Sequence, residues 1–191
     1  MTSITIFGNG NMGTAIDAVL AAGGADVQHI GSSERKAEVS GDIVVLAVPY
    51  PALAQIAADY GDQLAGKTVV DITNPLDFET FDALVVPAGS SAAEELQQAL
   101  PTANVVKAFN TNFAATLASG RVGDAATTVL IASDDARAKS ALADAIAAGG
   151  LRAIDAGSVK RAHELEAIGF LQLTLAAQEK VDWTAGFAVV S

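Results

Sequence analysis

The sequence contains no cysteine and only two histidines, His29 and His163, among its 191 residues. Disulfides, thiolate nucleophiles and cysteine-bound metals are therefore excluded, and two imidazoles leave little material for a metal cluster. Basic residues are also scarce, because eleven Lys and Arg face twenty-two Asp and Glu, for a net charge of −11. That charge repels phosphate backbones at long range, so we expect no nucleic acid partner.

Long apolar runs are missing, although 51% of the residues are hydrophobic. The most apolar region, 43–58, is interrupted by Pro49 and Pro51, which predicts a buried strand followed by a helix. A membrane span would need about 20 continuous apolar residues. The N-terminus, Met1-Thr2-Ser3-Ile4, has no basic flank and leads straight into a strand pattern, unlike a signal peptide. We therefore expect a cytoplasmic protein without a membrane partner.

Short β-branched runs alternate with longer alanine-rich stretches of helical periodicity. Nearly continuous apolar runs such as 43–48 are typical of strands that a parallel sheet buries on both faces. The predicted strands are 3–7, 25–30, 42–48, 68–72, 104–108, 127–132 and 151–155, and the predicted helices are 12–22, 51–60, 92–100 and 134–148. This order predicts an α/β fold, a Rossmann-type doubly wound parallel sheet with a short C-terminal helical extension.

A complete G-x-G-x-x-G motif, Gly8-Asn9-Gly10-Asn11-Met12-Gly13, follows the first strand and opens the first helix. Gly8 permits the tight turn, Gly10 lets a pyrophosphate approach the backbone, and Gly13 allows close packing of helix on strand. The free N–H groups at the helix start would hold the anion. Strand, loop, helix and second strand fall within about thirty residues, so the motif predicts dinucleotide binding rather than a merely structural turn.

The residues after the second strand indicate which dinucleotide binds. Positions 28–32, Gln-His-Ile-Gly-Ser, contain no carboxylate for a ribose 2′-hydroxyl. Ser32, Ser33, Arg35 and Lys36 offer two hydroxyls and two cations where a 2′-phosphate would lie, which favours NADP over NAD. The alternative is that one serine caps a helix and that both cations are merely solvated.

Three polar exits from the sheet predict the rest of the pocket. They follow the third, fourth and fifth strands and comprise Ala47-Val48-Pro49-Tyr50, Asp71-Ile72-Thr73-Asn74-Pro75-Leu76 and Lys107-Ala108-Phe109-Asn110-Thr111-Asn112. Ligands of open α/β folds bind outside the carboxyl ends of the strands, so these exits converge on a pocket, although each alone would be an ordinary turn. No Ser-His-Asp set can be assembled, and hydride transfer by a nicotinamide needs none.

The chain resembles the NADPH-dependent oxidoreductases typified by the enzyme that exchanges hydride between NADP and the deazaflavin coenzyme F-420, and the related dinucleotide-binding domain of the metalloreductases. The matching stretches are 6–13, 31–32, 69–76, 105–111 and the late segment 164–171. The asparagine-proline exit at 74–75 and the alanine-phenylalanine-asparagine exit at 108–110 are more specific than the glycine loop.

The resemblance implies that Asn9, Ser32 and Lys36 hold the 2′-phosphate, and that Val48, Pro49 and Ala108 border the nicotinamide. The family commonly has an arginine after the serine that matches Ser32, whereas this chain has Ser33 there. We assign cofactor binding to Gly8, Asn9, Gly10, Asn11, Met12, Gly13, Ser32, Ser33, Arg35, Lys36, Ala47, Val48, Pro49, Asn74 and Ala108. We assign contact with a hydride acceptor to Tyr50, Pro75, Phe109 and Asn110, and no side chain to obligatory acid–base catalysis.

The expected protein is thus an NADP-dependent oxidoreductase with a flavin-like acceptor such as the deazaflavin coenzyme. A shorter chain than the typical deazaflavin enzyme leaves a flavin, a quinone or a small carbonyl compound open as the acceptor. The alternatives are a reductase of a small imine or carbonyl substrate and a non-catalytic NADP-binding redox sensor. We expect residues 1–155 to form the NADP-binding domain and residues 156–191 to complete the pocket.

The late segment 167–177 is apolar almost all round, whereas a helix covering one sheet face should show a polar stripe. A second buried face needs a second surface, and an identical subunit is the commonest supplier. We therefore predict a homodimer built around this helix. The alternative is a helix that the tail 186–190 encloses completely.

Overall fold

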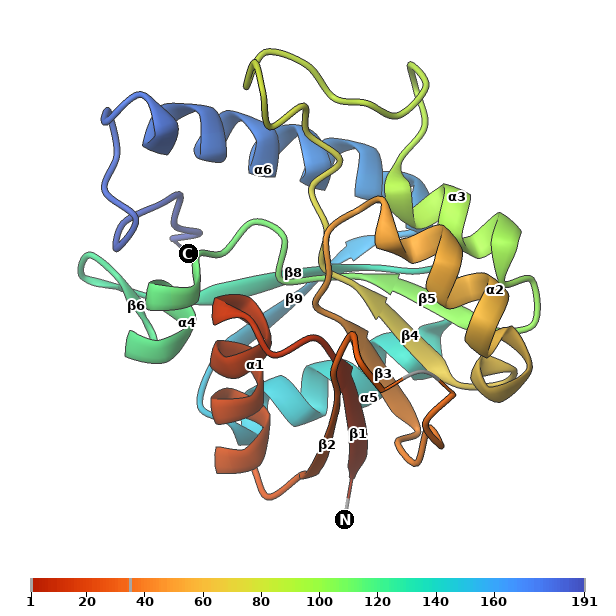
Figure 1. Cartoon of the computed structure of the whole chain (residues 1–191). Coiled ribbons are helices and arrows are strands. Elements are labelled where there is room, and N and C mark those ends of the chain that lie inside the picture. Colours follow the sequence, from red (N-terminus) through yellow and green to blue (C-terminus); the bar gives the residue numbers. More distant parts are fainter. Residues whose placement is uncertain (1, 35, 191) are drawn as a thin grey trace.

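The computed structural model describes residues 2–34 and 36–190. Within them one central sheet has the strand order β2-β1-β3-β4-β5-β8-β9 (Figure 1). The strands are β1 (Ser3–Phe7), β2 (Asp26–Ile30), β3 (Ile43–Leu46), β4 (Thr68–Asp71), β5 (Asn104–Lys107), β8 (Thr128–Ala132) and β9 (Arg152–Gly157). Each lies within two residues of its predicted bounds, so the strand predictions are confirmed.

The central sheet is mostly parallel, in agreement with the predicted doubly wound sheet, and one junction in it is antiparallel. Strands β1 to β5 pair in parallel, but β8 runs antiparallel to β5 through the pair Lys107 and Ala132, and β9 is parallel to β8. Between β5 and β8 the chain forms the short helix α4 (Ala114–Ser119) and a hairpin of β6 (Arg121–Val122) and β7 (Ala125–Ala126). A parallel neighbour normally needs a crossover helix, and this connection has none of that length.

Helices cover both faces of the sheet, as the doubly wound prediction requires (Figure 1). Helices α1 (Asn11–Ala22) and α5 (Ala136–Ala148) contribute Ile16, Leu20, Leu142 and Ile146 to one core cluster. Helices α2 (Ala52–Leu64) and α3 (Ala92–Ala99) pack on the other face through residues that include Leu53, Leu64 and Leu96. These four helices therefore leave the carboxyl ends of the parallel strands uncovered.

The last helix, α6 (Ala162–Ala177), follows the short 3-10 helix η1 (Val159–Arg161) and crosses the carboxyl edge of the sheet (Figure 1). It begins five residues before the segment whose apolar pattern we noted, and it also carries the buried polar side chains Glu166 and Gln172. No helix in the described part of the chain is long and apolar enough to cross a membrane.

Candidate functional site

The glycine loop connects β1 to α1 with very little space around two of its glycines. Gly8 has φ +99°, and a Cβ there would lie 2.3 Å from the carbonyl oxygen of Ala47. A Cβ on Gly13 would lie 2.7 Å from the carbonyl oxygen of Gly8. Around Gly10, by contrast, no atom lies within 4 Å of the position of a Cβ. Gly8 and Gly13 thus allow close packing, and Gly10 leaves open space for a ligand.

The start of α1 is suited to an anion. Its N-cap residue is Gly10, and no side chain caps this helix terminus. Uncapped N–H groups and the positive end of the helix dipole together bind phosphate well. The loop and the helix start therefore fit the pyrophosphate of a dinucleotide, as the motif predicted.

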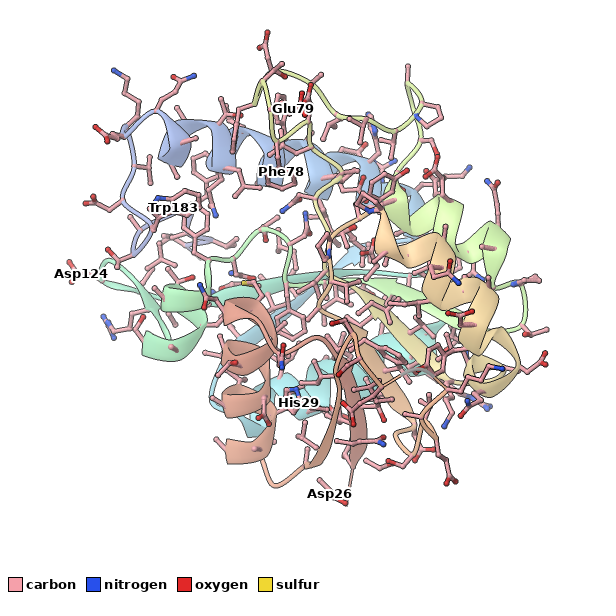
Figure 2. The ribbon with its side chains drawn as sticks, viewed as in Figure 1. Asp26, His29, Phe78, Glu79, Asp124 and Trp183 are labelled. Atoms are coloured by element: carbon pink, nitrogen blue, oxygen red, sulfur yellow. The ribbon has the colours of Figure 1, made fainter. Side chains whose placement is uncertain are left out.

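His29 of β2 supports the loop from beneath and is labelled in Figure 2. Its Nδ1 lies 3.3 Å from the carbonyl oxygen of Gly8, and its Nε2 lies 3.1 Å from Oδ2 of Asp17 on α1. The imidazole therefore ties the glycine loop to the helix that follows it. Both ring nitrogens of His29 are therefore engaged in contacts that stabilise the loop.

A cavity of about 400 Å³ lies on the β2 side of the loop. Many of the predicted cofactor residues line it, namely Gly8, Asn9, Gly10, Ser32, Ala47, Val48 and Pro49. Helix α2 closes it with Gln55, Ile56 and Asp59. Ser33 and Lys36 are exposed on the segment after β2 and do not line the cavity; Lys36 adopts φ +61°, and Arg35 lies outside the described residues. This cavity suits the adenosine half of the cofactor.

Two carboxylates that our sequence analysis did not consider, those of Glu34 and Asp59, also line this cavity. Glu34 folds back so that its Oε2 accepts a 2.7 Å hydrogen bond from the N–H of Gly31. The carboxylate of Glu34 thus reaches the end of β2 from three residues further along the chain. A search for acids that extended a few positions beyond the strand end would have found it.

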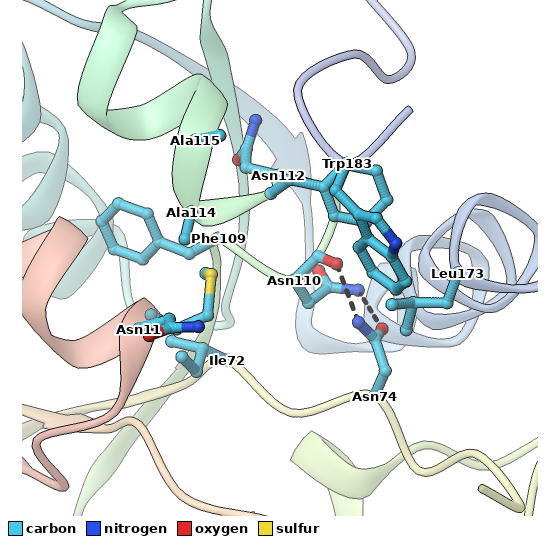
Figure 3. A pocket seen from close by; sticks show the side chains of 12 residues that line it. Asn11, Ile72, Asn74, Phe109, Asn110, Asn112, Ala114, Ala115, Leu173 and Trp183 are labelled. Atoms are coloured by element: carbon cyan, nitrogen blue, oxygen red, sulfur yellow. Dashed lines mark hydrogen bonds between the residues drawn. The ribbon is translucent and has the colours of Figure 1, made fainter. Parts of the chain in front are cut away.

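A second cavity, of about 440 Å³, lies beyond the start of α1 (Figure 3). Of the predicted site residues it includes Asn11, Met12, Asn74, Phe109 and Asn110. The residues that sequence analysis did not assign are Ile72, Asn112, Phe113, Ala114, Ala115, Leu173 and Trp183. The last two come from α6 and the tail after it, so the C-terminal segment contributes directly to this pocket.

Asn74 and Asn110 hold the floor of this cavity together (Figure 3). Nδ2 of Asn74 donates to the backbone oxygen of Asn110 at 2.8 Å, and Nδ2 of Asn110 donates to Oδ1 of Asn74 at 2.9 Å and to the carbonyl oxygen of Leu165 at 2.8 Å. Gly169 lets α6 approach, because a Cβ there would lie 2.2 Å from Oδ1 of Asn74. The loops after β4 and β5 and helix α6 are thereby joined at one point.

Two buried amide oxygens in this cavity have no donor among the described residues. They are Oδ1 of Asn110 and Oδ1 of Asn112, whose own Nδ2 donates to the carbonyl oxygen of Thr128. Buried polar atoms are almost always hydrogen-bonded in native proteins. Both oxygens are shielded from solvent, so they lie behind the surface that lines the cavity.

Several predicted site residues lie outside both cavities. Tyr50 lies between α2 and α3, where its hydroxyl donates to Oε2 of Glu95 at 2.5 Å. Burial, with the hydrogen bond to Glu95, raises the pKa of Tyr50 to about 12. Pro75 is buried and Ala108 is fully buried. Contact of Tyr50 and Pro75 with an acceptor, and of Ala108 with the cofactor, stays a prediction.

A buried ion cluster lies beneath the second cavity and was not predicted. Nζ of Lys107 lies 2.8 Å from Oδ2 of Asp71 and 2.8 Å from Oε1 of Glu166, and it donates to the carbonyl oxygen of Thr73. The other carboxylate oxygen of Glu166 accepts from the N–H of Ala92 at the start of α3 at 3.0 Å. Burial raises the pKa of Glu166, and the Lys107 charge opposes that rise.

Sequence comparisons identify relatives of the chain. Residues 27–75 match the family described as NADP oxidoreductase, coenzyme F420-dependent. The F420-dependent NADP reductase of Methanocaldococcus jannaschii is 30% identical over 154 residues, which cover 78% of this chain and 69% of that protein. The metalloreductase STEAP3 of Rattus norvegicus is 36% identical over 138 residues, or 71% of this chain, but this match spans only 26% of that longer protein.

The three-dimensional comparison agrees. A crystal structure from Arthrobacter sp. FB24, assigned as an F420-dependent NADP reductase, superimposes with a TM-score of 0.84 at 26% identity, and the match covers both chains completely. The glycine loop, the two cavities and these relatives lead to the same conclusion. The chain belongs to the coenzyme F420-dependent NADP oxidoreductase family and is an NADP-dependent oxidoreductase.

Proposed function

We propose that the protein transfers hydride between NADP(H) and a flat, flavin-like acceptor, with the deazaflavin coenzyme as the first candidate. The observation that carries this proposal is the chemistry of the second cavity. In the described part of the chain it is lined by amide, thioether, aliphatic and aromatic side chains, and none of them is an acid or a base. Such a lining positions flat rings but offers no proton donor to a carbonyl or imine substrate.

The residues of the first cavity and the glycine loop would hold the cofactor. The backbone N–H groups at the start of α1 bind its pyrophosphate, and Ser32, Ser33 and Lys36 bind its 2′-phosphate. We place the nicotinamide between Val48 and Pro49 of the first cavity and Met12 of the second. When bound, NADPH supplies a hydride to the acceptor and becomes NADP⁺, while solvent supplies the proton that the reduced acceptor takes up.

The main contribution of the chain to the reaction is positioning. Holding donor and acceptor carbons at roughly 3 to 3.5 Å lowers the barrier by several kcal/mol without acid–base catalysis. The joint of Asn74, Asn110 and Leu165 fixes the loops and α6 around this cavity. The amide side chains in the lining, among them Asn11, Asn74 and Asn112, favour an acceptor with hydrogen-bonding groups at its edge, which a flavin or deazaflavin has.

The test is a screen of NADPH oxidation against the deazaflavin coenzyme, FMN, FAD, a soluble quinone, a ferric chelate and a cyclic imine. We expect the deazaflavin or a flavin to be reduced fastest. Stopped-flow measurements with 4-deuterated NADPH should then show a primary isotope effect on acceptor reduction.

Two outcomes would contradict the proposal. Tight NADPH binding with no oxidation by any acceptor would favour a redox sensor. Turnover of the cyclic imine alone would favour a small-substrate reductase.

A further inference from the structure

Trp183 is the only tryptophan of the chain, and it lies on the segment that follows α6. It lines the second cavity, yet 53% of its surface is exposed. Figure 2 shows it in the space between α6 and α4. A large aromatic side chain that is half exposed at the mouth of a cavity is suited to contact with a ligand.

The indole contacts the ring of Phe113, the residue that precedes α4. The two ring centroids are 5.0 Å apart and the planes are tilted by 52°. This tilted contact fixes the orientation of the indole without stacking a protein ring on its face. The exposed part of Trp183 thus remains available to a second flat ring.

The backbone that carries Trp183 is anchored to α6. The N–H of Phe187 donates to Oε1 of Gln172 at 3.0 Å, and Nε2 of Gln172 donates to the carbonyl oxygen of Thr111 at 3.3 Å. Gln172 is only 3% exposed, so both hydrogen bonds are shielded from water. A turn closed by the N–H of Ala185 and the carbonyl of Asp182 then presents the indole. Gln172 therefore couples the tail to the loop after β5 that lines the same cavity.

The cavity has two chemically different ends (Figure 3). Asn11 and Ile72, from α1 and the β4 exit, lie at one end, and Leu173 and Trp183 lie at the other, with the pair of Asn74 and Asn110 between them. The first end adjoins the glycine loop and therefore the cofactor. The second end is formed by Leu173 and Trp183 of the C-terminal segment together with Phe113.

We propose that Trp183 is a specificity-determining residue that stacks on the conjugated ring of the acceptor at the C-terminal end of the cavity. This inference rests on the proposed function, because it assumes that the acceptor enters the second cavity. It adds that the tail after α6, rather than the nucleotide-binding sheet, selects flat heteroaromatic rings. Stacking of a flat ring on an aromatic side chain is worth about 1–3 kcal/mol, or roughly 5- to 150-fold in affinity.

The experiment uses the full-length protein saturated with NADP⁺ and titrated with 5-deazariboflavin. Since Trp183 is the only tryptophan, its emission reports this one site, and we expect saturable quenching. Calorimetric titration should show that Trp183→Leu weakens binding about tenfold or more, and that Trp183→Phe recovers part of the loss. The matched control is Phe187→Leu, a 45% exposed aromatic on the same tail that does not line the cavity, and it should bind within about twofold of the wild type.

The affinity for NADP⁺ and the free energy of unfolding separate recognition from folding. In Trp183→Leu the affinity for NADP⁺ should change by less than about twofold, and the midpoint of urea unfolding should stay close to that of the wild type, as for a surface substitution. The inference is overturned if Trp183→Leu binds 5-deazariboflavin as tightly as the wild type does, or if its affinity for NADP⁺ falls by the same factor as its affinity for 5-deazariboflavin. In either case, turnover by the wild type would still support the proposed function. Saturable binding that Trp183→Leu weakens, with no hydride transfer in the wild type, would overturn the proposed function and keep only the assignment of Trp183 as the residue that stacks on a flat ring.

Discussion

Asn74 and Asn110 form a reciprocal amide pair that links the exits of β4 and β5, with each Nδ2 donating to the other residue. The second bond of Asn110, to the carbonyl of Leu165, extends the pair to α6. The sequence predicted that Asn74 contacts the cofactor and that Asn110 contacts the acceptor. In the structure the two residues also join three segments that line one cavity.

We predict that Asn110→Asp destabilises the protein although it is almost isosteric. The substitution removes the Nδ2 donor and leaves Oδ1 of Asn74 and the carbonyl of Leu165 without it. Each buried acceptor left unsatisfied costs about 1–3 kcal/mol. Urea unfolding should detect the loss, and Asn104→Asp at the far end of β5 is the control. Equal stability of the two variants would contradict this role of Asn110.

We predict that Lys36→Ala selectively weakens NADPH binding. Lys36 is exposed on the segment that follows β2, which carries Ser32 of the first cavity, and there the 2′-phosphate is proposed to bind. Loss of one charge-assisted contact at an exposed site should weaken NADPH about five- to tenfold and leave NADH nearly unchanged. Equilibrium titrations should include Lys180→Ala as a control remote from this cavity. A parallel loss for both cofactors would argue against a phosphate contact.

The ion cluster predicts unequal effects of its members. Lys107→Met leaves the buried carboxylates of Asp71 and Glu166 without their cation, and breaking a buried pair in this way costs about 3–5 kcal/mol. Glu166→Gln should cost much less, since it leaves Lys107 paired with Asp71. Denaturant unfolding at neutral pH measures both. If Glu166→Gln were the more damaging change, the cluster would not depend on Lys107 as we argue.

Tyr50 should remain protonated at any physiological pH, because its pKa is about 12. The folded state holds this proton more tightly than the unfolded state, in which the pKa of a tyrosine is 10.0. The contribution to stability is therefore complete below pH 10 and falls as pH rises from 10 to 12. Ultraviolet titration of the wild type minus Tyr50→Phe should show this tyrosinate forming near pH 12. A midpoint near 10 would mean that Glu95 does not hold the hydroxyl.

We predict a homodimer that buries part of α6. Leu171 is 51% exposed, and Ile168, Phe170 and Leu175 are only half-buried, so the tail does not enclose the helix completely. Sedimentation at micromolar concentration should give about twice the 19.3 kDa of one chain, and Leu171→Asp should shift the species toward one chain. A wild type that sediments near 19.3 kDa would favour a helix that needs no partner.

Local sequence patterns predicted the strands, four of the helices and the glycine loop, because each depends on periodicity or on a nearby turn. They did not predict the direction of β8, since the apolar run 127–132 has the same pattern in either direction. The chain reverses its direction through α4, β6 and β7. These elements are too short to show the hydrophobic periodicity of a helix or a strand.

The site was predicted where it follows the strands and missed where it comes from the tail. Trp183 lies in a segment without periodicity, and only the return of the chain toward α4 makes it part of the pocket. The ion cluster, by contrast, could have been predicted from the sequence. Asp71 and Lys107 are opposite charges at the ends of two buried runs, and buried charges are almost always paired.

The way α6 is attached to the sheet restricts the positions that this helix can adopt. Apolar helix faces tolerate sliding, and a slide of one turn, about 5.4 Å, exchanges one aliphatic contact for another at modest cost. The same slide in this protein would separate Glu166 from Lys107 and bring a side chain onto Asn74 in place of Gly169. The contacts of Glu166 and Gly169 therefore fix the position of α6 along the edge of the sheet. They thereby also fix how far the tail lies from the glycine loop across the cavity.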